Sequence, residues 1–526
     1  MASKHADDRL LAAAEEAAGG AFHLFWGGSL ATVLSAVCAI LIARLLGPEQ
    51  YGIYSLALIV PGFLMLFTDY GVSQALTRFI ALYMSRNEQH RVIPLLRKGL
   101  ALNLATCFIM FLAGLILAEP LTNLLVNRPG MAHLVRIALI LVLIYPLSTA
   151  AGYALLGFGD MKGYAMIDVV RQAARAILSP LMIVLGFSVA GAVAGYVIAF
   201  AFGLAVGLTQ TYRRCRRIKN SKGSSGNVLH SMIAYGMPLY LSNTLNSFVT
   251  TLRGIILAYF TTNVLIGNFN TAMNFAVLIT LVSSPVATAL FPAFSKLGSS
   301  EAHAMFTHSV KYTAALIIPS AVFVSAMSRD LIFLLYGVSY SHAPLYLTLY
   351  AVTFLFAALG STVLGSFFSG VGDSKVNLKA TLFAVGIFVP SAAALTSILQ
   401  VEGLLIAIIL ATAASTLYSL MVATCRYSLK IDLKSSAGIC LAAVVAAAPI
   451  APLALYSPLP RIANLAAAAV LYLIAYLTAV PLLRIITRED LETLTRIFSK
   501  VAMLQPIVRI ISSYENKILG LINSEK

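Results

Sequence analysis

Apolar segments of about 20 residues or more recur along the whole chain, and they constrain the fold more than any other feature. Of the 526 residues, 60% are hydrophobic and only 11% are charged, whereas a soluble domain typically has about 25% charged residues. Each segment can cross roughly 30 Å of hydrocarbon at about 1.5 Å per residue. We therefore predict an all-α polytopic membrane protein with about 14 transmembrane helices. The predicted spans are 22–45, 51–70, 97–118, 132–157, 165–186, 188–212, 233–260, 264–292, 308–327, 344–369, 376–398, 402–426, 436–456 and 461–484.

The first two spans are predicted to form a hairpin with a very short connection. Gly47-Pro48 lies between the apolar run that ends at Arg44 and the run that begins at Tyr51. Proline cannot continue a helix without losing a hydrogen bond, and a Gly-Pro pair is typical of a tight turn. The second span ends near Asp69-Tyr70-Gly71, and we expect its helix to continue to about Tyr83.

This hairpin also carries a family resemblance. The order Ala43-Arg44-Leu45-Leu46-Gly47-Pro48-Glu49-Gln50-Tyr51-Gly52, followed by Asp69-Tyr70-Gly71, resembles the polysaccharide-transporter branch of the multidrug/oligosaccharidyl-lipid/polysaccharide exporter superfamily. That branch includes the O-antigen flippases and is related to the lipid II flippases. The resemblance covers nearly the whole chain. It implies a cavity between two lobes, formed by helices that include the first, second, seventh and eighth.

Composition and spacing divide the chain into six parts. The head is polar and Ala-rich and is expected to form a short helix on the membrane surface. The tail has apolar residues at helical spacing, interrupted by lysines and arginines, which is typical of an amphipathic interfacial helix pair; partner binding is the alternative. The parts are 1–21 cytoplasmic head, 22–212 N-lobe with six spans, 213–227 basic cytoplasmic linker, 228–426 C-lobe with six spans, 427–484 two extra spans, and 485–526 amphipathic cytoplasmic tail.

The two lobes share a weak internal repeat. Gly52, Tyr54 and Ala57 recur as Gly267, Phe269 and Ala272, each 215 positions later (267 − 52 = 215). Both triplets open an even-numbered span after a short external loop. We predict parallel repeats, related by a pseudo-two-fold axis along the membrane normal.

Basic residues indicate the orientation. The net charge is +16, and the basic residues concentrate in alternate loops, above all in the loop 212–226. Cytoplasmic loops are rich in lysine and arginine, so we place both termini on the cytoplasmic side of the cell membrane. We expect contact with membrane lipids and not with nucleic acid. When basic residues are counted for the orientation, Arg171 and Arg175 are assigned to the cytoplasmic loop before the fifth span. Arg253 is then the one basic residue well inside a predicted span.

The sequence contains no motif for catalysis or for a cofactor. The glycine-rich stretch 370–375 lacks the spacing of a phosphate-binding loop and is predicted to be a cytoplasmic turn. No His-Glu-x-x-His and no nucleophile elbow occurs. The five cysteines are scattered and include no Cys-x-x-Cys pair. We predict no enzyme, no cofactor, no disulfide and no metal site.

Polar residues follow one face of the seventh span. Asn243, Asn246, Thr250 and Arg253 are three, four and three residues apart, which places them on one side of a helix. Such a stripe in a membrane helix faces other protein or water. Arg253 either is a structural residue satisfied by neighbouring carbonyl groups or faces an anion in a cavity. On the second interpretation these residues bind substrate.

Two other spans contribute candidates for substrate binding. Asn270 and Asn274 lie four residues apart on the eighth span, and Arg44 lies at the outer end of the first. The resemblance implies that these side chains line the cavity. Packing between helices is the alternative for small polar groups.

Asp69 has two interpretations. It lies near the cytoplasmic edge of the second span, where it is a gate or structural contact, or else a carboxylate that couples transport to a cation. Many relatives carry an acidic residue near the position of Arg253, and the seventh span has none here. A coupling ion is therefore left open.

The leading functional hypothesis is a flippase for a polyprenyl-(di)phosphate-linked oligosaccharide, which works by alternating access without ATP hydrolysis. A pyrophosphate favours arginine, and a glycan favours amides and hydroxyls. The alternative is a cation-coupled multidrug or toxin antiporter, which predicts carboxylates inside the spans. A membrane-embedded glycosyltransferase is a third hypothesis, but it requires a large outer loop, and the predicted loops are short.

Overall fold

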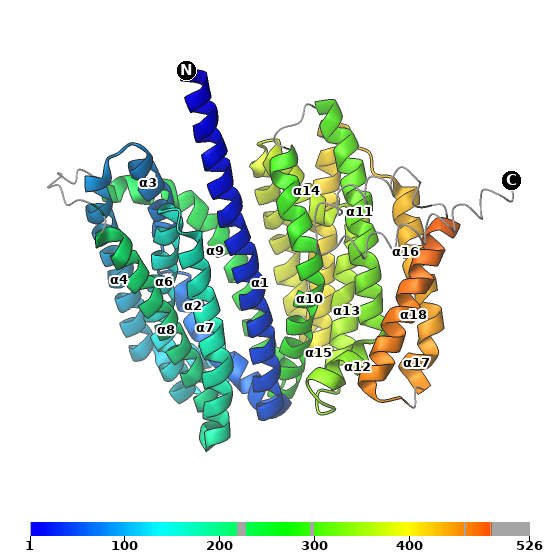
Figure 1. Cartoon of the computed structure of the whole chain (residues 1–526). Helices are drawn as coiled ribbons and strands as arrows, with labels where there is room; N and C mark the ends of the chain where they lie inside the picture. The colour runs from blue at the N-terminus through cyan, green and yellow to red at the C-terminus, as the bar shows by residue number, and fades with distance from the viewer. Residues whose placement is uncertain are drawn as a thin grey trace. The chain divides into compact units, whose positions relative to one another are not determined.

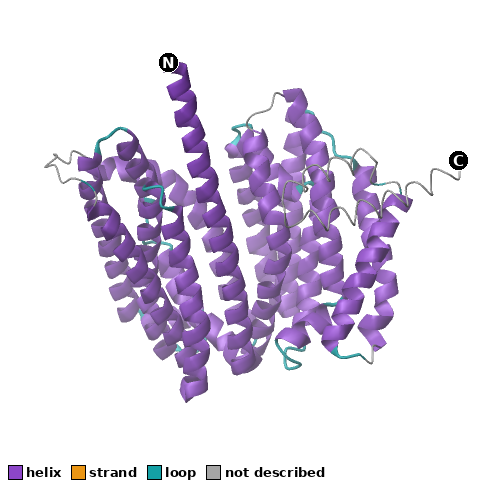
Figure 2. Ribbon diagram, in the orientation of Figure 1, coloured by secondary structure: helices purple, strands orange, loops and turns teal. Residues whose placement is uncertain are grey.

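The computed structural model describes residues 2–216, 218, 228–294, 299–456, 459–483 and 485. These residues are helical apart from short turns, and no strand occurs among them (Figure 2). The chain divides into two compact units, Met1–Asn270 (unit 1) and Thr271–Lys526 (unit 2). The division falls inside one helix, α10 (Asn263–Phe294), and not at the predicted basic linker. Most of that linker lies outside the described residues.

Among the residues that the structure describes, unit 1 contains nine α-helices and the start of α10 (Figure 1). The nine are α1 (Ala2–Ala57), α2 (Ile59–Met65), α3 (Val72–Ser85), α4 (Val92–Ile116), α5 (Ala118–Leu125), α6 (Ala132–Gly157), α7 (Met161–Met182), α8 (Ser188–Arg216) and α9 (Val228–Phe260).

Unit 2 contains the rest of α10 and eight further helices among the residues described (Figure 1). The eight are α11 (Ser299–Ala326), α12 (Ser328–Leu335), α13 (Ala343–Leu355), α14 (Ser361–Gly370), α15 (Ser374–Tyr427), α16 (Leu433–Ala447), α17 (Ala451–Tyr456) and α18 (Arg461–Leu482).

The helices account for the fourteen predicted spans. Eight helical stretches in the described part are long and apolar enough to cross a membrane, and the bent pair α13–α14 makes a ninth. Three of the eight are 43, 56 and 54 residues long, about twice what one crossing of roughly 30 Å requires. Each is interrupted by residues with positive φ: Gly47, Gly186 with Ser188, and Gln400. Each therefore forms two spans, and α9 and α10 complete the set. The Gly47 turn confirms the predicted hairpin.

The second span is broken, and the expectation of a helix continuing to Tyr83 is wrong. Helix α2 ends at Met65, Tyr70 and Gly71 have positive φ (47° and 81°), and α3 begins at Val72. Backbone groups freed by a break inside a membrane need partners from neighbouring helices. The Thr106 hydroxyl of α4 donates to the Thr68 carbonyl at 2.6 Å, and the Tyr240 hydroxyl of α9 donates to the Leu66 carbonyl.

Helix α3 lies in a buried apolar cluster of unit 1. Val72, Leu76 and Ile80 are buried among side chains that include Leu95 of α4 and Met232 of α9. At the start of α3 the backbone of α9 comes very close. A Cβ atom on Gly71 or on Gly236 would lie 2.2 Å from a backbone atom of the other residue. Only glycine at both positions permits this approach.

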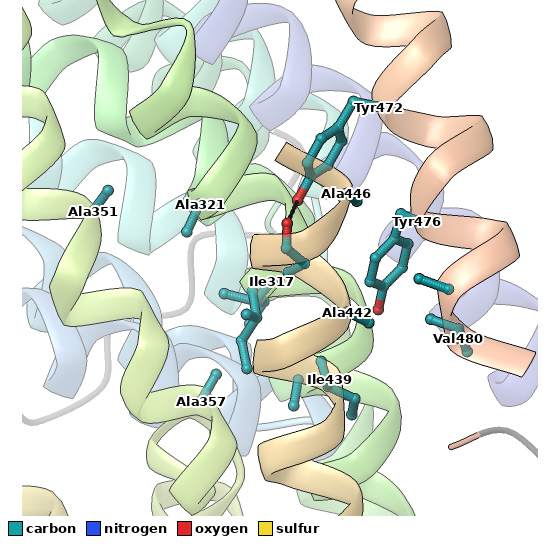
Figure 3. Close-up of a cluster of buried hydrophobic side chains, with 14 of the residues drawn as sticks. Ile317, Ala321, Ala351, Ala357, Ile439, Ala442, Ala446, Tyr472, Tyr476 and Val480 are labelled. Carbon is teal, nitrogen blue, oxygen red and sulfur yellow. Dashed lines mark hydrogen bonds between the residues drawn. The ribbon is translucent and has the colours of Figure 1, made fainter. Parts of the chain in front are cut away.

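The two extra spans belong to the core of unit 2. Side chains of α11, α16 and α18 form one buried cluster, in which the facing surface of α16 is mostly alanine. Figure 3 shows Tyr472 and Tyr476 projecting from α18 toward α16. The Tyr472 hydroxyl donates to the Ala443 carbonyl at 3.2 Å, and the Tyr476 hydroxyl donates to the Ala315 carbonyl at 3.0 Å. These bonds fix α18 against α16 and α11.

The two ends of the chain were expected to lie on the membrane surface. Residues 2–21 instead continue α1 without a break, so the head is an extension of the first span (Figure 1). The predicted amphipathic tail lies, apart from Ile485, outside the described residues.

Candidate functional site

The polar stripe of the seventh span lies on α9. Asn243, Asn246 and Thr250 have exposed side chains, and Arg253 is half-buried. The Thr250 hydroxyl donates to the Asn246 carbonyl at 3.1 Å. Next to Arg253, Gly254 faces α2, where a Cβ atom would lie 3.0 Å from Ile59 Cδ1.

This stripe continues the packed face of α9. At about 100° per residue, the stripe lies on the same side of the helix as Met232, Gly236 and Tyr240. Those three residues are buried. The same face is thus buried in the first half of α9 and carries exposed amides and a hydroxyl in the second half. This arrangement suits a polar surface that a ligand can reach.

The other predicted candidates are spread along α10 and α1. The Asn270 amide donates to the Ile266 carbonyl at 3.1 Å, within α10. Asn274, one turn further along the same face, is half-buried and belongs to unit 2, whereas Asn270 ends unit 1. Arg44 is exposed, three residues before the Gly47 break.

Asp69 lies in the break of the second span. Its carboxylate accepts hydrogen bonds from the Ser73 backbone N–H at 3.2 Å, the Ser73 hydroxyl at 2.6 Å and the Asn103 amide at 3.1 Å. The bonds to Ser73 satisfy donors in the first turn of α3, as an N-terminal cap does. Asn103 is fully buried on α4. Asp69 therefore ties the restarted helix to α4.

A charged cluster on α7 was not predicted from the sequence. Arg171 and Arg175 do not lie in a loop: they are within the fifth span, about 15 and 21 Å from its start at Met161, at about 1.5 Å per residue. Counting them with the cytoplasmic loop was therefore wrong, as was the statement that Arg253 is alone inside a span. The signal was present, since Asp168, Arg171 and Arg175 recur at steps of three and four residues and so share one helix face.

We call this group, with the aromatic residues around it, the arginine cluster. Its members come from four helices and all belong to unit 1. They are Tyr54 of α1, Tyr145 of α6, Asp168, Arg171, Gln172 and Arg175 of α7, and Tyr196 and Phe200 of α8.

The two arginines of the cluster have different partners. Arg171 forms an ion pair with Asp168 at 2.6 Å, and its guanidinium carbon lies 4.7 Å from the centre of the Phe200 ring. Arg175 donates to the Tyr54 hydroxyl at 3.1 Å, and its guanidinium carbon lies 4.2 Å from the centre of the Tyr196 ring. Aromatic faces attract cations but carry no negative charge. The single carboxylate therefore leaves the cluster with a net positive charge.

Several polar atoms of the cluster have unused hydrogen-bonding capacity. Arg171 Nε, Gln172 Oε1 and Arg175 Nε are buried and have no hydrogen-bond partner among the residues that the structure describes. A buried polar group without a partner typically costs about 1–3 kcal/mol. The side chains of Arg171 and Asp168 are 17% and 32% exposed, so one side of the cluster is accessible. The chemistry of the site is that of an anion binder.

A metal centre has no support in the residues that the structure describes, because they contain no group of three or more histidine, cysteine, aspartate or glutamate side chains placed to hold an ion. The charged groups inside the spans of unit 1 are instead mainly arginines.

The model of the family described as "Polysaccharide biosynthesis protein" matches residues 17–298. The chain belongs to this family. The resemblance inferred from residues 43–71 is thereby confirmed. The matched region contains all residues of the arginine cluster and of the α9 stripe.

One curated protein is similar to this chain over most of its length. The chain is 24% identical over 349 residues to the succinoglycan biosynthesis transport protein ExoT of Rhizobium meliloti (strain 1021), an alignment that covers 65% of this chain and 67% of that protein.

Solved structures show the fold. The lipid II flippase MurJ, in an inward closed conformation, aligns with a TM-score of 0.73 and 14% identity, over 87% of this chain and 97% of that chain. An inward-facing multidrug resistance MATE family transporter of the MOP superfamily aligns with a TM-score of 0.64 and 16% identity, over 76% and 94% of the two chains. The chain is a multi-pass membrane protein with the fold of these transporters.

Proposed function

We propose that this protein is a flippase that moves a polyprenyl-(di)phosphate-linked oligosaccharide across the cytoplasmic membrane for the assembly of a cell-surface polysaccharide. Family membership and the similarity to a succinoglycan transport protein and a lipid II flippase support this proposal. Translocation proceeds by alternating access without ATP hydrolysis, from a cytoplasmic side that holds both termini. The Gly47 turn is predicted to lie on the outer side of the membrane.

The observation that carries the proposal is the sign of the charge inside α7 and α9. Beyond their first turns, α7 and α9 hold Arg171, Arg175 and Arg253 against a single carboxylate, Asp168. An arginine near the middle of a membrane costs at least about 2.5–3.5 kcal/mol, so such residues are usually functional. Guanidinium groups bind phosphate oxygens in pairs. These arginines suit a lipid-linked phosphate.

The neighbouring polar residues suit the glycan of such a substrate. Asn243, Asn246 and Thr250 present amides and a hydroxyl along the exposed face of α9 that leads to Arg253. We assign these three, with Asn270 and Asn274 of α10, to contacts with sugar hydroxyl groups. Arg44 and Arg253 are assigned to the phosphate groups.

A cation-coupled antiporter fits the described residues less well. Such a transporter needs a carboxylate that is able to bind its ion or cationic substrate. In this protein Asp168 is paired with Arg171, and Asp69 accepts three hydrogen bonds that hold the break of the second span together. Both carboxylates thus have structural partners, and the remaining charges are positive.

The proposal is tested with purified full-length protein in lipid vesicles. The substrate is a polyprenyl diphosphate that carries a short fluorescent oligosaccharide, and the measurement is the fraction that becomes accessible in the opposite leaflet. We expect protein-dependent flipping of this lipid and none of the same glycan on a phosphate-free polyprenol. Equal flipping of the phosphate-free lipid, or transport of a cationic drug with no flipping of the diphosphate lipid, would contradict the proposal.

A further inference from the structure

We propose that the head group of an anionic phospholipid binds in a basic pocket of unit 2, which is built from residues that the proposed transport site does not use. The pocket has a volume of about 780 Å³ and is built from both ends of α15 and the turn that precedes it. Its lining includes Lys375, Lys379 and Arg426, and its wall includes Tyr418 and Met421. The volume lies in the range typical of small-molecule sites, about 300–1,000 Å³.

The path of α15 explains why the three cations meet. This helix is 54 residues long and contains a break at Gln400, where φ is 52°. Its two halves form a hairpin, because residues near its start and near its end line the same pocket. Lys375 and Lys379 lie four residues apart, on one face of the first half. Arg426 lies in the last turn of the second half.

The pocket keeps a net positive charge after its internal pairing. Asp373 is its single carboxylate among the lining residues, and it accepts from Arg426 at 2.6 Å and from the Tyr427 hydroxyl at 2.9 Å. Neither Lys375 nor Lys379 forms an ion pair with another described residue. Both lysine side chains are exposed. Two ammonium groups are therefore available to an anion.

The surface next to the pocket is apolar, which distinguishes a lipid from a soluble anion. Exposed side chains continue from the pocket along both halves of α15, namely Leu378, Leu382 and Phe383 on the first half and Leu417 and Met421 on the second. The Phe383 and Tyr418 rings lie 5.8 Å apart and connect the two halves. Exposed apolar residues on a membrane span contact lipid chains. Cations at the end of such a surface match a phospholipid, with its anionic head and two acyl chains.

The position of the cations along the span supports the same ligand. Lys375 and Lys379 occupy the first two turns of α15, and Arg426 occupies its last turn, so all three lie where a span meets the head groups. Basic pockets between transmembrane helices on the cytoplasmic side recognise anionic lipid head groups. A nucleoside phosphate is disfavoured, because the glycine-rich stretch 370–375 does not have phosphate-binding-loop spacing.

Native mass spectrometry of the full chain tests the proposal. The protein is taken from nanodiscs that contain phosphatidylglycerol and phosphatidylcholine in equal amounts, and the retained lipid is identified. We expect the wild-type protein to retain one phosphatidylglycerol molecule. The double variant K375Q/K379Q should bind it roughly twenty-five-fold more weakly, since each basic residue near an anionic membrane surface contributes about five-fold.

The matched control is K430Q/K434Q. It removes Lys430, between α15 and α16, and Lys434, in the first turn of α16; both are exposed and neither lines the pocket. We expect this variant to retain phosphatidylglycerol like the wild type, and both variants to elute as folded protein, because all four side chains are exposed. An equal loss of lipid in the control would contradict the proposal, since the effect would then be one of general charge. Displacement of the lipid by millimolar inorganic phosphate, or equal retention of phosphatidylcholine, would also overturn it.

Discussion

Gly52 and Gly267 each pack against the backbone of the helix that carries the other. A Cβ atom on Gly52 would lie 1.9 Å from the Asn263 carbonyl oxygen, and one on Gly267 would lie 1.9 Å from the Pro48 carbonyl oxygen. The repeat offset that relates Gly52 to Gly267 also relates Pro48 to Asn263. The contact is therefore reciprocal, as in an interface with two-fold symmetry. This geometry gives the weak sequence repeat a physical reason, because both copies need glycine at the same contact.

Substitution of either glycine by alanine should destabilise the protein by a similar amount. The added methyl group meets backbone, which cannot rotate away, and overpacking of this kind typically costs about 1–3 kcal/mol. We expect G52A and G267A each to lower the melting temperature of the purified protein. The matched control is G62A, because a Cβ atom on Gly62 has no neighbour within 4 Å. A melting temperature for G52A equal to that of G62A would refute the close contact.

Arg253 should show a graded response to substitution. A Gln side chain keeps hydrogen bonding but loses attraction for a phosphate, and Lys keeps the charge but loses the planar fork. At equal protein level in the membrane, we expect flipping activity in the order wild type, R253K, R253Q. If Arg253 is only structural, R253Q will instead be scarce in the membrane and fully active per molecule. Activity in reconstituted vesicles, normalised to protein, separates these outcomes.

Substitution of Arg175 should reduce flipping more than substitution of an exposed arginine. Its guanidinium joins Tyr54 to the Tyr196 ring, and Gln supplies neither the charge nor the stacking plane. We expect R175Q to reduce flipping of the diphosphate lipid at least about ten-fold, with R175K intermediate. The control R136Q removes an exposed arginine whose partner is Glu119, and surface ion pairs typically contribute about 0–1 kcal/mol. Wild-type flipping rates for R175Q, measured per molecule, would exclude the arginine cluster from transport.

Asp69 distinguishes a structural carboxylate from one that couples transport to a cation. The D69N variant keeps an oxygen acceptor for the Ser73 N–H and hydroxyl groups, whereas D69A leaves these donors without it, at a typical cost of about 1–3 kcal/mol. We expect D69N to fold and transport nearly as the wild type does and D69A to lose thermal stability. Transport by D69N that no longer responds to an ion gradient, in a protein as stable as the wild type, would assign ion coupling to Asp69.

Asp432, which lies between α15 and α16, gives a pH dependence with a defined sign. The hydroxyl and backbone N–H of Ser435 donate to its carboxylate, and these hydrogen bonds hold the pKa of Asp432 below its usual value. A lowered folded-state pKa stabilises the protein above the unfolded-state pKa, near 3.9, and this contribution is lost as pH falls through the folded-state pKa. We expect D432A to lower the melting temperature at pH 7, with the difference from the wild type shrinking below about pH 4. A difference that stays constant down to pH 3 would argue against the cap.

The features that sequence predicts well here are local. The Gly47-Pro48 turn and the lengths of the spans follow from residue types and backbone rules, and the structure has both. The break at Asp69-Tyr70-Gly71 was harder to predict, although these residues stood out. Its freed carbonyl groups are satisfied by Thr106 and Tyr240, and these partners are not visible in the local sequence.

The prediction of a functional site from sequence has the same limit, as the arginine cluster shows. The spacing of Asp168, Arg171 and Arg175 is visible in the sequence, but the surroundings that make these residues acceptable inside a span are not. Tyr54 and Tyr196 come from α1 and α8, far from α7 in sequence. The packing of α16 was also unpredictable, because a face made of Ala442, Ala443 and Ala446 fits against many partners.

The broken second span has a consequence for how the protein is made. The Leu66 carbonyl receives its hydrogen bond from Tyr240, a residue 174 positions later in the chain. When the first two spans leave the ribosome, the helix that completes the break has not been synthesised. The Leu66 carbonyl therefore lacks its hydrogen-bond donor until five more spans have been synthesised. The break of the second span reaches its final hydrogen bonding only after α9 has been made.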